Sequence, residues 1–131
     1  RHGVTIAIHN QVEGHPSGAI AASQLGDALA LSPAFRLKLD IGNLTASDAD
    51  AVSILRAHQA RVSYVLVKDR LRHGGASQAL GEGDTPIAAV LGVLKSSRSA
   101  IPALVEYDYA GLRSSAEEVA AAVGYMTRVV A

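Results

Sequence analysis

Short runs of apolar, often β-branched residues alternate four times with longer stretches of helical periodicity along this chain. The apolar runs lie at 4–8, 35–39, 62–67 and 101–105. Such alternation predicts parallel strands joined by right-handed helical crossovers, so we expect an α/β fold in the order β-α-β-α-β-α-β-α. The pattern allows two closures, an open doubly wound sheet and one half of a closed barrel.

Each predicted helix has a recognisable start. We expect the first over 18–31, the second from the Ser47 region to about residue 59, the third from Ile87 and the fourth near 115. Polar loops are expected at 41–44 and 70–84. The starts are helix-capping residues or Pro at the first helical position. They are Ser17, Ser47, Thr85 with Pro86, and either Ser114 with Glu117 or Ser115 with Glu118.

The composition is globular and excludes several classes of protein. Twelve basic and twelve acidic residues cancel and form no basic stripe, so no nucleic-acid partner is expected. No uncharged apolar run reaches the roughly 18 residues of a membrane span, so no membrane partner is expected either. The chain has no cysteine, which excludes disulfides and is compatible with a cytoplasmic location.

All four apolar runs end in polar or charged residues. In a parallel sheet these ends share the C-terminal rim, where βα loops build active sites. Imidazole and carboxylate groups there suit a divalent metal, which could hold a hydroxy-ketone or diol and stabilise an enediolate. The alternative for any one of them is a solvated strand end, or a structural pair in the case of the third run. The residues are His9, Asn10, Gln11, Asp40, Lys68, Asp69 and Glu106.

Four blocks of sequence resemble the sugar phosphate isomerase/epimerase group of xylose isomerase-like TIM barrels. Residues 3–11 (GVTIAIHNQ) resemble the family strand that ends in Glu, or in some members His, followed by Asn-His. Residues 37–43 (LKLDIGN) resemble the strand that ends Asp-Thr-Gly-His. Residues 61–69 (RVSYVLVKD) resemble the strand that reads Arg-Ile-x-x-Val-His-Leu-Lys-Asp. The loop LGEGD at 80–84, followed by ALVEY at 103–107, resembles the last such block.

The resemblance implies the C-terminal (β/α)4 half of a TIM barrel and a divalent metal, Mn, Mg, Co or Zn. It implies metal ligation by His9, Asp40 and Glu106, and catalytic roles for Glu106 and Lys68. Leu66 stands where the family has a metal-binding His, so the implied metal site is incomplete. The substrate contacts that we predict at this rim are Asn10, Gln11, Asn43, Asp69 and Glu82.

Residues 1–131 are thus expected to form one partial, half-barrel domain. Four strands alone leave two unpaired edges and an apolar inner face. We therefore expect a separate N-terminal half barrel, self-association, or a longer chain to cover them. The expected function is metal-assisted isomerisation, epimerisation or enolising lyase chemistry on a sugar or polyol. The alternatives are a non-catalytic ligand-binding or assembly module and, disfavoured by the neutral charge, an endonuclease-like barrel.

Overall fold

A four-stranded parallel sheet forms the centre of the computed structural model, which describes residues 3–12, 14–15 and 20–131. The strand order is β1-β2-β3-β6, and every neighbouring pair is parallel. The bounds are Ile6–His9 for β1, Phe35–Asp40 for β2, Val62–Val67 for β3 and Ala103–Val105 for β6. Because the spatial order follows the chain order, successive strands are neighbours, as in the wall of a barrel.

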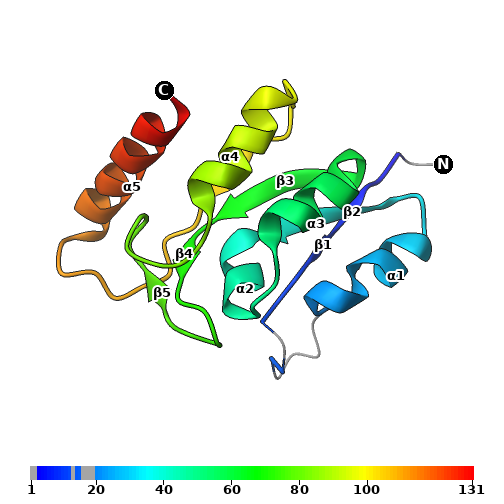
Figure 1. Cartoon of the computed structure of the whole chain (residues 1–131), viewed down its shortest axis with the longest axis horizontal. Coiled ribbons are helices and arrows are strands. Elements are labelled where there is room, and N and C mark those ends of the chain that lie inside the picture. Colours follow the sequence, from blue (N-terminus) through cyan, green and yellow to red (C-terminus); the bar gives the residue numbers. More distant parts are fainter. Residues whose placement is uncertain (1–2, 13, 16–19) are drawn as a thin grey trace.

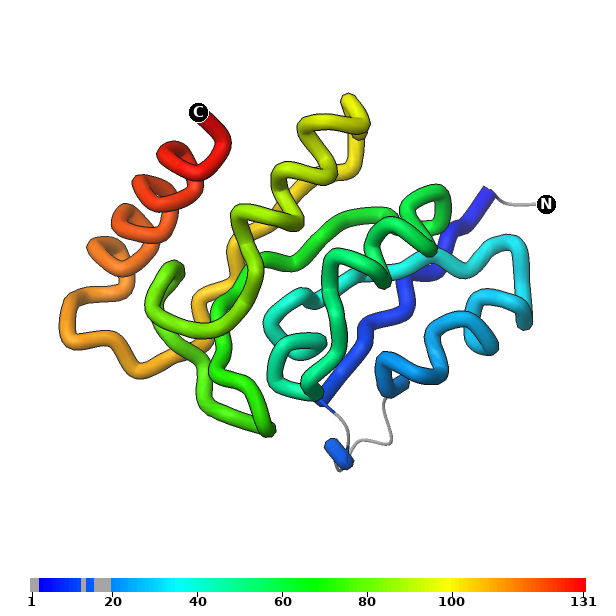
Figure 2. Tube along the Cα trace, viewed as in Figure 1, coloured from blue at the N-terminus to red at the C-terminus, as the bar shows by residue number. Residues whose placement is uncertain are grey.

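Helices follow the strands and cover one side of the sheet (Figure 1). They are α1 (Leu25–Ala30), α3 (Ala51–His58), α4 (Ile87–Ser96) and α5 (Ser115–Val130). Helix α3 packs beside α4, and α4 packs beside α5. The chain therefore progresses across the molecule from β1 and α1 to β6 and α5 (Figure 2). This arrangement confirms the predicted α/β fold of parallel strands and alternating helices.

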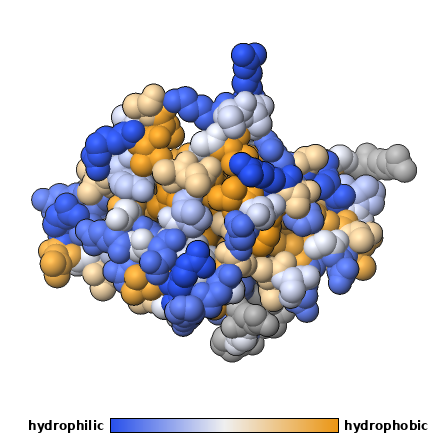
Figure 3. All heavy atoms as spheres, in the orientation of Figure 1, coloured by the Kyte–Doolittle hydropathy of each residue, from blue (hydrophilic) through white to orange (hydrophobic). Residues whose placement is uncertain are grey.

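The hydrophobic core lies between the sheet and these helices. Its strand residues alternate along the sequence, as the pleat requires, and include Leu37, Leu39, Val65 and Val67. Seen from the helical side, hydrophobic residues lie among a mainly hydrophilic surface (Figure 3). The residues between them in sequence point to the other side of the sheet, which no helix of residues 3–12, 14–15 and 20–131 covers.

Two segments that we expected to be loops contain regular structure. Residues 41–46 form helix α2 (Ile41–Ala46), because the Asp40 side chain accepts a hydrogen bond from Asn43 N at 2.8 Å and caps its start. In the 70–84 loop, β4 (Asp69–Arg70) pairs with β5 (Ser77–Gln78) in an antiparallel two-stranded sheet.

Three predicted helix starts differ from the structure. Helix α4 begins at Ile87 with Pro86 as its N-cap, and not with Thr85 as cap and Pro86 as the first helical residue. The second crossover helix is capped by Asp50, whose carboxylate accepts bonds from Val52 N and Ser53 N at 3.0 Å, and not by Ser47. The first helix begins at Leu25 after a 3₁₀ turn over Ala22–Gln24, and the predicted cap Ser17 lies outside the described residues. The Ser114–Glu117 capping box of α5 is confirmed. No helix in the described part of the chain is long and apolar enough to cross a membrane.

Candidate active site

The ammonium group of Lys68 lies at the centre of the C-terminal rim of the sheet. Its Nζ is 3.0 Å from Asp40 Oδ2, 3.2 Å from Glu106 Oε1 and 3.1 Å from Asp108 Oδ2. An ammonium has three N–H donors, so each donor can serve one carboxylate. The Lys68 side chain is only 7% exposed. We call these four residues the Lys68 cluster.

Burial would lower the pKa of Lys68, but the charges of Asp40 and Asp108 and their hydrogen bonds outweigh it. The net effect raises the pKa of the ammonium above its ordinary value. Lys68 is therefore a fixed positive charge at neutral pH and does not act as a proton carrier.

Asp40 is the most firmly held member of the cluster. Its side chain is fully buried, with Oδ1 capping α2 and Oδ2 shared between Lys68 and His9 Nε2, the latter at 3.2 Å. The Asn10 side chain bonds both the backbone N–H and the carbonyl of Asp40, at 2.9 Å each. The buried Asn10 amide therefore continues the β1–β2 pairing and positions Asp40.

The predicted site amides form a network behind His9. Asn43 Nδ2 donates to Asn10 O at 3.2 Å and to Gln11 Oε1 at 3.1 Å, and Gln11 Nε2 lies 3.3 Å from His9 Nδ1. Arg70 Nη1 donates to Asn43 Oδ1 at 3.1 Å. Asn10 and Asn43 are fully buried, and their amides hold Asp40 and Gln11 in position. The half-buried Gln11 can turn toward the rim, and its substrate contact stays a prediction.

Asp69 braces the following loop rather than pairing with Lys68. Its carboxylate accepts hydrogen bonds from the backbone N–H groups of Gly81, Gly83 and Thr85, at 2.8, 3.0 and 3.0 Å. The side chain is buried, which assigns it to loop structure instead of to the mouth of the site. Glu82 lies on the loop that Asp69 holds and is exposed.

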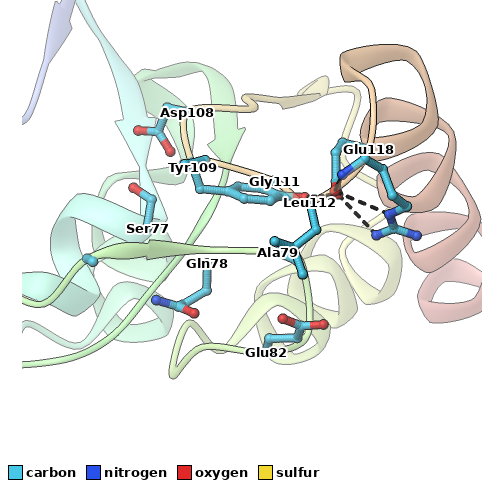
Figure 4. Close-up of a pocket in the computed structure, with 12 residues that line it drawn as sticks. Ser77, Gln78, Ala79, Glu82, Asp108, Tyr109, Gly111, Leu112 and Glu118 are labelled. Atoms are coloured by element: carbon cyan, nitrogen blue, oxygen red, sulfur yellow. Dashed lines mark hydrogen bonds and ion pairs between the residues drawn. The ribbon is translucent and has the colours of Figure 1, made fainter.

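A pocket of about 710 Å³ adjoins the cluster. One wall comes from the 76–82 segment and the other from the 108–113 segment and the start of α5 (Figure 4). Asp108 joins the two features, because it lines the pocket and also binds Lys68. The polar lining residues are Ser77, Gln78, Glu82, Asp108, Tyr109, Arg113 and Glu118.

Three side chains fix the 108–113 wall of the pocket. Glu118 is buried and receives Tyr109 Oη at 2.8 Å and Arg113 Nη2 at 3.0 Å. The hydrogen bonds from Arg113 and then from Tyr109 lower the pKa of Glu118. Burial and the Glu118 hydrogen bond raise the pKa of Tyr109 to about 12. Tyr109 also packs edge-on against Tyr107, with ring centroids 4.6 Å apart.

The predicted metal ligands do not surround a common point in this arrangement. His9 and Asp40 are in contact, but Glu106 is joined to Asp40 through the ammonium of Lys68. Leu66, two residues before Lys68 on β3, offers no donor atom. Over residues 3–12, 14–15 and 20–131, no three His, Asp or Glu side chains are placed to hold a metal ion. A divalent metal therefore does not fit these residues as they stand.

Asp108 is the site residue that the sequence analysis missed. It follows Glu106 by two positions, and residues two apart in an extended segment share a face. That spacing was the available signal. The strand ends at Val105, however, so the sequence did not show that the extended course continues.

Comparison with known proteins supports the fold through structure alone. No family model and no curated protein matches the sequence. Among solved structures, a xylose isomerase domain protein from Planctomyces limnophilus matches 95% of this chain with a TM-score of 0.77 and 20% identity. An L-ribulose 3-epimerase matches 98% with a TM-score of 0.72 and 18% identity. The 3-keto-D-glucoside 4-epimerase from E. coli matches 95% with a TM-score of 0.74 and 9% identity.

The chain thus has the fold of half a TIM barrel. It spans about half of each matched structure, namely 46%, 48% and 46% of their lengths. The matched structures include a xylose isomerase domain protein, so the half-barrel fold implied by the resemblance of the four sequence blocks is confirmed.

Proposed function

We propose that this chain supplies half of the active site of a barrel enzyme that isomerises or epimerises a sugar or polyol, or eliminates from it through the same enolised state. The observation that carries the proposal is a buried ammonium, that of Lys68, held against two partly exposed carboxylates beside an open pocket. Two of the matched structures are sugar epimerases, which supports this reaction class.

The Lys68 cluster contains a fixed positive charge and a carboxylate that can leave it, two groups that enolisation uses. The side chains of Glu106 and Asp108 are 33% exposed, whereas Asp40 is fully buried, so either of the first two can leave Lys68 when a ligand enters. A substrate carbonyl oxygen that replaces Glu106 would meet a fixed positive charge where negative charge develops. The released Glu106 would then lie near the substrate as a free carboxylate.

Glu106 takes the proton from the carbon next to the carbonyl. The C–H electron pair becomes the new C=C bond, and the carbonyl π pair moves onto the oxygen that Lys68 holds. The hydroxyl proton on the adjacent carbon then passes to the oxygen that Lys68 holds, and a new carbonyl forms at that carbon. Return of the proton from Glu106 to the former carbonyl carbon completes an isomerisation. Epimerisation needs a second proton carrier, and we assign this role to Asp108, the member of the Lys68 cluster that lines the pocket.

The lining of the pocket favours a substrate without phosphate. Three carboxylates face it, those of Glu82, Asp108 and Glu118, against one guanidinium, that of Arg113. Arg113 is already bound to Glu118. A phosphate would meet net negative charge there, whereas hydroxyl groups can bond Ser77, Gln78 and the carboxylates. We therefore expect a neutral sugar or polyol.

Deuterium exchange tests the reaction class. The protein is incubated in D₂O with neutral ketoses and aldoses and, separately, with their phosphates, and loss of the carbon-bound proton is followed by ¹H NMR. We expect exchange in a neutral sugar and a loss of at least about 100-fold in Glu106→Gln. Asp27→Asn, an exposed carboxylate on α1, is the control and should retain the rate.

Absence of exchange with every sugar, or an unaffected Glu106→Gln, would contradict the catalytic proposal. A second candidate function would then stand, a non-catalytic barrel that binds a ligand in the pocket. Its supporting observations are that all three donors of Lys68 are used and that Leu66 cannot ligate. Saturable binding of a neutral sugar without exchange is the result expected for it.

We also propose that the uncovered side of the sheet is completed by another half barrel. The matched structures are about twice as long as this chain, which is compatible with a missing complementary half. The edge strands β1 and β6 are where it would pair.

A further inference from the structure

We propose that Lys68 is the resident cation of this site and stands in place of a divalent metal. The inference concerns the cation alone, so it holds whether or not the protein turns over a sugar. It rests on the positions of four side chains, those of Lys68, Asp40, Glu106 and Asp108.

The first step is the geometry of the three carboxylates. Their nearest oxygens lie 3.0, 3.2 and 3.1 Å from Lys68 Nζ, at hydrogen-bonding distance from a nitrogen. A divalent metal would draw the same oxygens to about 2.0–2.6 Å from its own centre. One set of oxygens cannot surround both cations, and the space between them is filled by the ammonium.

The second step is that Lys68 is anchored in this position. Its side chain is 7% exposed, and its backbone passes against α2 at Gly42, where a β-carbon would lie 2.8 Å from the Lys68 carbonyl oxygen. Asp40 is held by the Asn10 amide and by the α2 N-terminus. Asp40 cannot turn away without breaking those hydrogen bonds, and the close approach to α2 limits movement of the Lys68 backbone.

The third step is the missing ligand. Leu66 is the neighbour of Lys68 on the same face of β3, and it pairs in register with Asp40 on β2 and Leu104 on β6. Its isobutyl group places hydrocarbon beside the carboxylates, where a metal would need an imidazole or an oxygen. A monovalent cation that forms hydrogen bonds tolerates this neighbour, because its three donors are already satisfied.

Metal titration tests the inference directly. Binding of Mn²⁺ and of Zn²⁺ to the full chain is measured by isothermal titration calorimetry, without any substrate. We expect no saturable site in the wild type up to millimolar metal. Lys68→Met keeps the length of the side chain and removes the charge, so Asp40, Glu106, Asp108 and His9 become available. This variant should gain one Mn²⁺ site at least tenfold tighter than any in the wild type.

Lys38→Met is the matched control, because Lys38 lies on the same sheet two residues before Asp40 and its loss changes the net charge equally. It should bind metal no better than the wild type.

If Lys68→Met does not fold, metal binding to Leu66→His tests the proposal instead. With Lys68 as the cation, the added imidazole alone should not create a metal site. One equivalent of tightly bound Mn²⁺ in the wild type, a new site in Leu66→His, or none in folded Lys68→Met would overturn the proposal. Each of these outcomes is independent of turnover.

Discussion

At Gly42 the start of α2 passes so close to Lys68, the residue after β3, that a side chain has no room. A β-carbon there would lie 2.5 Å from Lys68 Cγ and 2.8 Å from the Lys68 carbonyl oxygen. The second contact is with backbone, so it cannot be relieved by a rotamer change alone. The choice of glycine at this position is therefore part of how Lys68 reaches the carboxylates.

We predict that Gly42→Ala lowers the free energy of unfolding by about 1–3 kcal/mol, as overpacking of a filled site does. Urea unfolding followed by circular dichroism measures it. Gly92→Ala is the control, since Gly92 lies within α4 and a β-carbon there meets nothing within 4 Å. That change should instead stabilise by up to about 1 kcal/mol, because Ala favours a helix interior. Equal effects of the two changes would contradict the close contact.

Sequence reasoning found which residues gather at the rim but not what they do there. Asp40, Lys68 and Glu106 end consecutive strands, so parallel topology alone brings them together. Asn10 bonds a backbone group 30 positions away in sequence, and Asp69 bonds one 16 positions away. No local sequence pattern reveals such partners. Similarly, whether Lys68 faces a substrate or three carboxylates depends on side-chain geometry.

At the scale of elements, helix α5 and the 108–113 segment form one unit through the start of the helix. The backbone N–H of Ser114 donates to Glu117 Oε2 at 3.0 Å, and the backbone N–H of Glu117 donates to Ser114 Oγ at 3.4 Å. Ser114→Ala removes the hydroxyl and should cost about 1 kcal/mol of unfolding free energy. Ser115→Ala, one residue into the helix, is the control and should change it by less than about 0.5 kcal/mol. A larger loss in the control would place the cap elsewhere.

Glu118 makes the stability of this unit fall at acid pH. Its pKa is lowered in the folded protein, first by the Arg113 hydrogen bond, from an ordinary value of 4.5. A lowered pKa means that the charged form stabilises the fold above 4.5 and that this contribution is lost as the pH falls below it. The wild type should therefore exceed Glu118→Gln in stability more at pH 7 than at pH 3.5, measured by urea unfolding at both. A difference that does not change with pH would assign Glu118 a packing role only.

The titration of Tyr109 reports on the same unit at alkaline pH. Its pKa of about 12 arises from burial and from the Glu118 carboxylate, and the ordinary value is 10.0. A raised pKa favours folding fully below pH 10, and the contribution is lost as the pH rises toward 12. In a titration followed by difference absorbance at 295 nm, Tyr109→Phe should lack the phenol that ionises at the highest pH. A Tyr109→Phe titration that superimposes on the wild type would contradict the buried Tyr109–Glu118 bond.

The alternating pattern predicted the elements of the sheet layer more reliably than the irregular segments. Apolar runs predicted β2 and β3, and an apolar helical face predicted α4, because these elements are buried in the core. Helix α2 escaped prediction because six residues carry too little periodicity, and a single capping carboxylate, Asp40, starts it. The β4–β5 pair escaped because each strand has two residues and depends on Asp69 holding the loop.

At the scale of the whole molecule, no helix in the part of the chain that the structure describes covers the second side of the sheet. Leu104 lies on that side, in register with Leu66, and is 47% exposed at the edge strand β6. Its neighbour Leu66 is buried and yet does not belong to the core between sheet and helices. An apolar row ending at a free strand edge favours association with another sheet.

We predict that the 131-residue chain on its own associates in a concentration-dependent way, because pairing covers this edge and buries the row. Sedimentation equilibrium between about 1 and 100 µM spans dissociation constants typical of weak self-association. Leu104→Lys should weaken the association at least tenfold, since it places a charge in the apolar row. Leu31→Lys makes the same change at a site 80% exposed just after α1 and should leave the association unaltered. If the two variants behave alike, the uncovered sheet is not the interface; if only Leu104→Lys weakens association, the interface lies at this edge of the sheet.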